Sequence, residues 1–133
     1  MIRIESPLMT KLEEEARERG QRLDTLVSEI IDEGLRMRRV PGIVFTDGPA
    51  GRRATITGCG IDVWEVIATW NSLGQDAGKL RENYHWLSDS QICAALTYYQ
   101  AYPAEVDTRL AREAILTPEH VYEMYTFLDP RRK

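Results

Sequence analysis

The stretch GRRATITGCGIDVWEVIATW, residues 51–70, passes from a β-type run into a helix-type run through Gly58-Cys59-Gly60. The dinucleotide fingerprint G-x-G-x-x-G begins with this spacing, but Val63 takes the place of its third glycine and no long βαβ unit follows. Two glycines at such a junction permit a positive φ in a tight connection. We therefore predict a plain strand-to-helix turn around a small buried thiol, and not a phosphate-binding loop.

The cysteines and histidines form no recognisable site. Cys59 and Cys93 have no C-x-x-C spacing, and His85 and His120 stand alone, so zinc has no ligand set and Cys59 has no evident base. The carboxylates of Glu13-Glu14-Glu15 are interleaved with basic residues, which is typical of a solvated helix face. We expect no metal, no cofactor and no catalytic residues, and thus a protein that is not an enzyme.

Length and composition indicate a small globular protein. The 133 residues suffice for one ordinary domain or two very small ones, and 43% of them are hydrophobic. A net charge of −4 gives no general attraction to nucleic acid, so any DNA binding has to come from a local patch. The chain begins without a signal-like segment and has no run of about 20 apolar residues, so we expect a cytoplasmic location and no membrane contact.

Residues 1–39 predict a short strand followed by two helices. Met1 to Glu5 alternates apolar and polar residues, after which Ser6 and Pro7 are expected as N-cap and first helical residue, and Gly20 as C-cap. A second helix starts near Asp24 and carries apolar residues on one face. About forty residues usually cannot bury enough apolar surface to be stable alone, so this unit is expected to need a partner chain.

Residues 42–103 predict a hairpin and three helices, after a linker at residues 38–42. The β-type runs 42–45 and 54–57 are separated by a turn-rich segment. Asp62 is expected to cap the first helix, and Ser88 with Gln91 to form a capping box on the third. The expected helices cover residues 63–73, 76–84 and 88–101.

Residues 104–133 predict a C-terminal helical extension. A helix is expected at residues 109–116, and Thr117-Pro118-Glu119 is a strong start for another. The last helix carries apolar and aromatic residues, and basic residues follow Asp129-Pro130. Either these aromatics anchor a partner or they pack on the protein's own core. The side chains concerned are Tyr122, Tyr125, Phe127, Leu128, Arg131 and Arg132.

The N-terminal unit resembles the ribbon-helix-helix family of dimeric repressors and antitoxins. The residues from Gly20 to Ile31 follow its pattern G-x-x-Leu-x-x-Leu-Val-x-x-x-Ile. The resemblance implies a homodimer in which one strand from each subunit forms a ribbon that enters the major groove of operator DNA. Ile2 and Ile4 then face the dimer core and Arg3 reads bases, while the start of the second helix offers N–H groups to phosphate. The DNA-binding residues expected on this basis are Arg3, Leu23, Asp24 and Thr25.

Three blocks in the middle of the chain resemble the domain of unknown function 433 family, whose members look like VapB-type antitoxins. The family strings G-K-P-x-I-x-G-T-R-I-P-V-x-D-I, E-D-Y-P-H-L and A-L-x-Y correspond to residues 51–66, 82–87 and 95–98. The resemblance implies a small hairpin, a homeodomain-like tri-helical bundle and a PIN-type toxin as partner. The family's arginine is Gly60 here, and residues 88–101 contain no Lys or Arg, so we interpret the bundle as a packing or protein-binding module.

These resemblances imply an antitoxin of a type II toxin–antitoxin system, which dimerises, binds its operator and neutralises a PIN-type ribonuclease. Because such enzymes hold carboxylates around metal, an antitoxin arginine in the active site forms charge-assisted pairs there and displaces the catalytic cations. Arg131, Arg132 and Lys133 are the candidates, with Tyr122, Tyr125, Phe127 and Leu128 as apolar anchors. The alternative is a stand-alone dimeric transcription regulator without a toxin.

Overall fold

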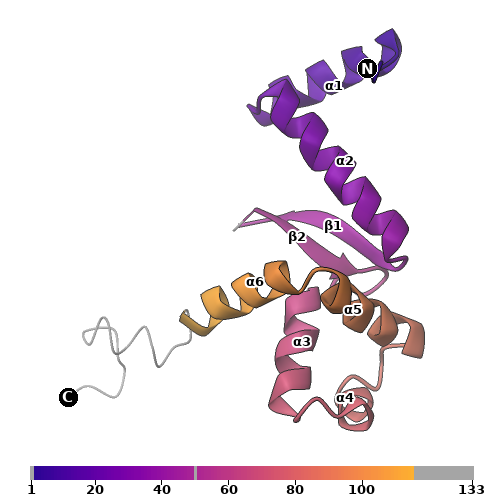
Figure 1. The fold of residues 1–133 in the computed structure, drawn as a ribbon, viewed down its shortest axis with the longest axis vertical. Coiled ribbons are helices and arrows are strands. Elements are labelled where there is room, and N and C mark those ends of the chain that lie inside the picture. Colours follow the sequence, from indigo (N-terminus) through magenta and orange to yellow (C-terminus); the bar gives the residue numbers. More distant parts are fainter. Residues whose placement is uncertain (1, 50, 116–133) are drawn as a thin grey trace, which may run out of the picture. The chain divides into compact units, whose positions relative to one another are not determined.

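A computed structural model describes residues 2–49 and 51–115 and divides the chain into two compact units, Met1–Pro41 and Gly42–Lys133 (Figure 1). The described residues form six helices and a single two-stranded antiparallel hairpin. The prediction of a mainly helical protein with a small hairpin is therefore confirmed. No helix in the described ranges is long and apolar enough to cross a membrane.

The first unit consists of α1 (Ser6–Arg19) and α2 (Leu23–Arg39). Gly20 ends α1 with φ 63°, as predicted, because a left-handed residue lets the chain leave the helix while its N–H still bonds the last turn. The predicted Ser6 cap is wrong by one residue: Glu5 is the N-cap and its side chain makes no capping bond. Helix α2 also includes residues 38 and 39, which we expected to belong to the linker.

Residues 2–5 have no regular secondary structure in this single chain. A strand needs a neighbouring strand to pair with, and the ribbon-helix-helix arrangement takes that neighbour from a second subunit. The predicted ribbon therefore stays a prediction.

The second unit begins with the hairpin of β1 (Ile43–Gly48) and β2 (Gly51–Ile56). Ile43 pairs with Ile56 and Phe45 with Ala54, so these side chains share one face of the hairpin. The Ile43 and Ile56 side chains are buried, and the Phe45 ring meets Tyr98 edge-on at 6.3 Å between centroids. The hairpin thus packs one face against the helices.

Residues 57–62 form the turn predicted around Cys59, but the expectation of a buried thiol is wrong because Cys59 is only half-buried. Gly58 and Gly60 have φ of 90° and 71°, which residues with a side chain rarely adopt, and the Gly60 N–H donates to the Ile56 carbonyl at 3.2 Å. The Ile56 N–H in turn donates to the Ile61 carbonyl at 2.8 Å. The loop is closed on itself by backbone bonds, as a plain turn requires.

Three helices follow this turn: α3 (Val63–Ser72), α4 (Ala77–Asn83) and α5 (Asp89–Ala101). The Ser88 hydroxyl accepts from the Gln91 N–H and the Gln91 side chain accepts from the Ser88 N–H, which confirms the predicted capping box. Apolar residues from all three helices close the core. Those with at most 6% exposure are Val63, Val66, Ile67, Leu80, Ile92, Ala94, Ala95 and Tyr98.

The last described helix, α6 (Pro103–Ile115), begins six residues earlier than predicted. Pro103 stands first in the helix, where its missing N–H costs nothing, so the proline starts α6 instead of only ending α5. Val106 is 3% exposed, and the Tyr98 hydroxyl donates to Glu105 at 2.6 Å. Helix α6 packs against α3 and α5, near the start of α3 in Figure 1.

Candidate functional site

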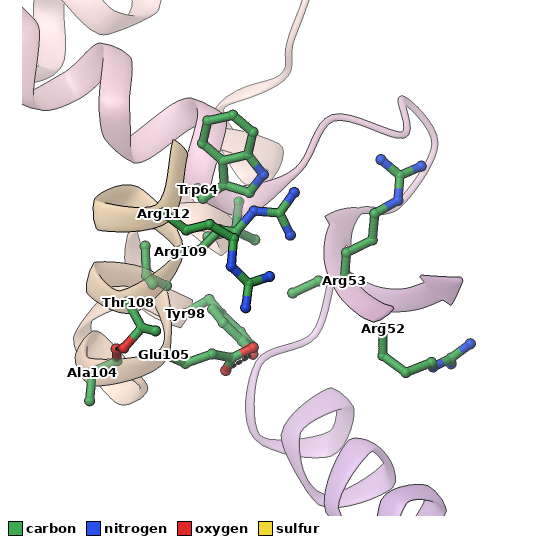
Figure 2. Close-up of a pocket in the computed structure, with 12 residues that line it drawn as sticks. Arg52, Arg53, Trp64, Tyr98, Ala104, Glu105, Thr108, Arg109 and Arg112 are labelled. Atoms are coloured by element: carbon green, nitrogen blue, oxygen red, sulfur yellow. Dashed lines mark hydrogen bonds between the residues drawn. The ribbon is translucent and has the colours of Figure 1, made fainter. Parts of the chain in front are cut away.

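A cleft of about 420 Å³ lies in the second unit between β2, the start of α3 and α6 (Figure 2). Four of its lining side chains are arginines, two from β2 and two from α6. Ala54, Val63 and Val106 add an apolar lining. The arginines are Arg52, Arg53, Arg109 and Arg112.

Asp62 organises the side of the cleft where β2 meets α3. Its carboxylate is 3% exposed, pairs with Arg53 Nη1 at 2.9 Å through Oδ1, and accepts from Trp64 Nε1 at 2.9 Å through Oδ2. Asp62 occupies the N-cap position of α3 as predicted, but its side chain makes no capping bond. Burying a carboxylate costs free energy unless the charge is paired. Of the two donors to Asp62, the charged guanidinium of Arg53 is a stronger partner than the neutral indole N–H of Trp64.

Arg109 is held at two points. Its Nε donates to Glu113 Oε1 at 2.7 Å, one turn further along α6, and its guanidinium carbon lies 5.3 Å from the centre of the Trp64 ring. Within the described residues no acceptor bonds its two terminal nitrogens. Arg112 is exposed and makes no ion pair with any described residue.

Figure 2 shows the guanidinium groups of Arg109 and Arg112 extending into the space between Trp64 and the Tyr98–Glu105 pair. Tyr98 is fully buried, and its hydroxyl bond to Glu105 closes the opposite side of the cleft. The cleft thus presents N–H donors in its centre and a hydrogen-bonded carboxylate at its border.

Glu65 lies near the cleft on α3, and burial raises the pKa of its carboxyl above the ordinary value of 4.5, with a smaller contribution from the Asp62 charge. The charges of Arg53 and Arg109 oppose this rise in pKa. The partly desolvated carboxylate is therefore less favourable than one in water.

The DNA-binding residues expected from the sequence belong to the first unit, whereas the cleft residues belong to the second. Arg3 is exposed in the irregular segment before α1. At the start of α2, Leu23 is half-buried while Asp24 and Thr25 are exposed. Asp24 pairs with Arg22 at 3.0 Å and accepts from the Thr25 N–H at 2.9 Å, so a carboxylate already bonds one of the expected phosphate donors.

The expected toxin-binding residues lie outside the described residues. They are Tyr122, Tyr125, Phe127, Leu128, Arg131 and Arg132. Their assignment therefore stays a prediction.

The first unit leaves a group of large apolar side chains exposed on its two helices. Ile31 is 52% exposed and Leu35 62%, against 2% for Leu26, which packs inside the unit. Leu8 and Ile30 are exposed to a similar degree. Exposed apolar side chains gathered on so small a unit are typical of an interaction surface.

Sequence reasoning missed the arginine cleft because its two halves are far apart in the chain. Arg53 and Arg109 are 56 positions apart, and no local motif joins them. The only local signal is the spacing of Arg109 and Arg112, which places both on one side of a helix.

Within the described ranges, no group of three or more His, Cys, Asp and Glu side chains could hold a metal ion.

Comparison with known proteins gives a family match within the second unit. No curated protein and no solved structure matched the chain. Residues 43–99, which include the hairpin, α3, α4 and most of α5, match the family model described as "Protein of unknown function (DUF433)", as the three sequence blocks predicted.

Proposed function

We propose that this protein is an antitoxin of a type II system, a homodimer that binds operator DNA, represses its own synthesis and neutralises a PIN-type ribonuclease. The observation that supports this most is the apolar surface of the first unit. Two helices of 14 and 17 residues leave Leu8, Ile30, Ile31 and Leu35 largely exposed. A second copy of the chain covers these residues and supplies the core that one copy lacks.

Dimerisation also gives residues 2–5 a role. Paired antiparallel with the same segment of a second copy, they form a ribbon with Ile2 and Ile4 on one face and Arg3 on the other. Arg3 is exposed and its guanidinium can donate two bonds to the O6 and N7 acceptors of a guanine.

The start of α2 supplies the proposed phosphate contacts through Leu23, Asp24 and Thr25. The negative charge of Asp24 by itself repels a phosphate at this position. Arg22 Nη2 lies 3.0 Å from the Asp24 carboxylate and balances that charge. The N-terminal end of α2 therefore keeps its partial positive charge, and the Thr25 N–H leaves Asp24 Oδ1 when it donates to a phosphate.

The toxin-neutralising part of the proposal is supported by the family match of residues 43–99 and by the composition of the C-terminal segment. Tyr122, Tyr125, Phe127 and Leu128 are proposed as anchors, and Arg131 and Arg132 as partners of the toxin's carboxylates. On this proposal the protein acts by binding and needs no cofactor. Hydrolysis of RNA by the purified chain contradicts it.

The operator contact is tested with Arg3→Ala and the full-length chain. We expect specific binding to the DNA upstream of its own gene to be lost in a fluorescence anisotropy titration, while the dimer persists in sedimentation. Arg81→Ala is the matched control, since Arg81 is an exposed arginine of the second unit whose ion pair, among the described residues, is with exposed Asp89. Unchanged operator affinity of Arg3→Ala rules out Arg3 as the base reader.

Toxin neutralisation is tested by co-expression with the product of the neighbouring gene, which the proposal expects to be a PIN-type nuclease. The full chain is expected to restore growth, and a chain ending at residue 117 is expected not to. If the shorter chain still neutralises the nuclease, the C-terminal residues are not the inhibitory segment. If no nuclease is neutralised but operator binding holds, the protein is a stand-alone regulator.

A further inference from the structure

We propose that the cleft of the second unit binds a small organic oxyanion, a carboxylate or a phosphomonoester, through Arg53, Arg109 and Arg112. The proposal concerns none of the residues assigned to dimerisation, operator or toxin. A failure of the proposed function therefore does not affect this proposal, and the reverse also holds.

The first argument is the supply of directed N–H donors. A guanidinium carries five N–H groups in a planar fork. Arg109 uses only its Nε on Glu113, and Arg53 uses Nε on Thr46 and Nη1 on Asp62. Both terminal nitrogens of Arg109, Nη2 of Arg53 and the whole guanidinium of Arg112 bond no described residue. Carboxylate and phosphate oxygens match this donor geometry.

The second argument is that two of the three arginines are fixed before any ligand arrives. Buried Asp62 orients Trp64 through its indole N–H and Arg53 through Nη1. Trp64 in turn supports the guanidinium of Arg109, which Glu113 holds from the other side. Side chains that are already ordered lose less conformational entropy on binding, so the same bonds give a higher affinity.

The third argument is charge, which limits the kind of anion. Three of the arginines pair with carboxylates, namely Asp47 with Arg52, Asp62 with Arg53 and Glu113 with Arg109. Glu105 adds a fourth carboxylate at the border and Glu65 lies nearby, so the charge of the four arginines is fully balanced by acids. A nucleic acid needs a broad positive field, which this balance removes. A small anion needs only a few well-placed donors.

The shape of the cleft supports the same ligand class. A volume of about 420 Å³ is within the range of small-molecule sites. The carbon part of the ligand is expected to lie against Ala54, Val63 and Val106, while its oxyanion meets the arginines. Purely inorganic phosphate fills only the polar part of the site.

The experiment is a two-dimensional ¹H–¹⁵N NMR titration of the full chain with inorganic phosphate, phenyl phosphate and succinate, at constant ionic strength. The three tryptophans give separate indole N–H signals. We expect the signals of Trp64 Nε1 and Arg109 Nε to shift in a saturable way. The Trp86 indole lies outside the cleft lining and is expected to stay unchanged. The absence of a saturable shift with all three ligands refutes the proposal.

Three variants test whether the arginines cause the shift. Arg112→Ala removes an exposed side chain without a described partner, and Arg109→Lys keeps the charge but loses the fork. Each is expected to weaken binding about tenfold or more, as loss of charge-assisted bonds does. Arg81→Ala is expected to bind as the wild type does. Wild-type affinity in both Arg112→Ala and Arg109→Lys, with the folded spectrum retained, refutes the assignment.

The ligand series also separates the sources of the oxyanion. Phenyl phosphate binding above succinate identifies a phosphomonoester site, the reverse order identifies a carboxylate site, and either result supports the proposal. A titration with duplex DNA completes the test. If DNA alone shifts the Trp64 signal and Arg112→Ala abolishes that shift, the cleft is a nucleic-acid surface and the proposal is wrong.

Discussion

Asp62 and Asp47 illustrate how burial decides the weight of an ion pair. Asp62 lies 2.9 Å from Arg53 and Asp47 lies 3.0 Å from Arg52, but the two carboxylates are 3% and 66% exposed. The two distances are nearly equal. When the exposed pair breaks, water solvates both charges, whereas water does not reach the buried carboxylate. The difference in environment therefore predicts a difference in stability.

Asp62→Ala is expected to destabilise the second unit by about 2–3 kcal/mol, because it leaves Arg53 and the Trp64 indole N–H without their acceptor. Asp47→Ala is the control, with an expected loss below about 1 kcal/mol. Urea unfolding followed by tryptophan fluorescence measures both. Equal losses in the two variants contradict the role assigned to Asp62.

Glu65 provides a prediction on pH. Since burial raises the pKa of Glu65 in the folded state, its charged form weakens the fold. The cost is absent below pH 4.5 and grows as the pH rises through the folded pKa. Glu65→Gln is thus expected to raise the urea midpoint at pH 7 and to have no such effect below pH 4.5. The same gain at both pH values shows that a change in packing, and not the charge, is responsible.

At the scale of elements, the sequence predicts most helix boundaries where a local signal exists. Gly20, the Gly58–Gly60 turn and the Ser88–Gln91 box all act on neighbours within a few residues, so their effect is readable from the chain. The start of α6 was missed because a proline that follows a helix also suits the first turn of the next one. Which role applies depends on the packing of Val106, which is a tertiary contact.

The same distinction applies to the candidate site. The residue types that line the cleft are visible in the sequence, but their meeting depends on how β2, α3 and α6 pack. The carboxylate of Asp62 shows this well, since a capping position predicts a local bond and the fold supplies a cation instead. Local patterns cannot report a partner that is distant in the chain.

The packing of α6 predicts that the second unit needs this helix. A chain that ends at residue 102 loses Val106, the Glu105 acceptor of Tyr98 and the arginine that lies over Trp64. We expect it to unfold at a clearly lower urea concentration, or to aggregate, because buried side chains of α3 and α5 become exposed. A chain that ends at residue 116 keeps α6 and is the control. Equal stability of the two truncated chains shows that α6 is dispensable.

At the scale of the whole molecule, unfolding of the first unit is expected to depend on protein concentration, whereas unfolding of the second unit is not. All three tryptophans, at positions 64, 70 and 86, belong to the second unit, so fluorescence follows that unit alone. The circular dichroism of helices follows both units. If the first unit is a dimer, its part of the dichroism transition moves to higher urea as the protein concentration rises, because association stabilises the folded state by mass action.

Measurements at 2 and 200 μM total chain, on the order of a hundredfold range, are sufficient to see this shift. The fluorescence transition is expected not to move. Ile31→Asp places a charge on the exposed apolar face of α2 and is expected to abolish the concentration dependence. Two transitions that are both independent of concentration contradict the dimer.

The position of α6 relative to the family match has a further consequence. The match ends at residue 99, whereas α6 begins at Pro103 and contributes Arg109 and Arg112 to the cleft. One side of the cleft therefore lies outside the part of the chain that matches the family model. If the cleft binds the proposed oxyanion, substitutions in α6 alone are expected to change its ligand selectivity while the hairpin and α3 to α5 keep their residues. Arginines at the positions of Arg109 and Arg112 then indicate which related chains carry the same pocket.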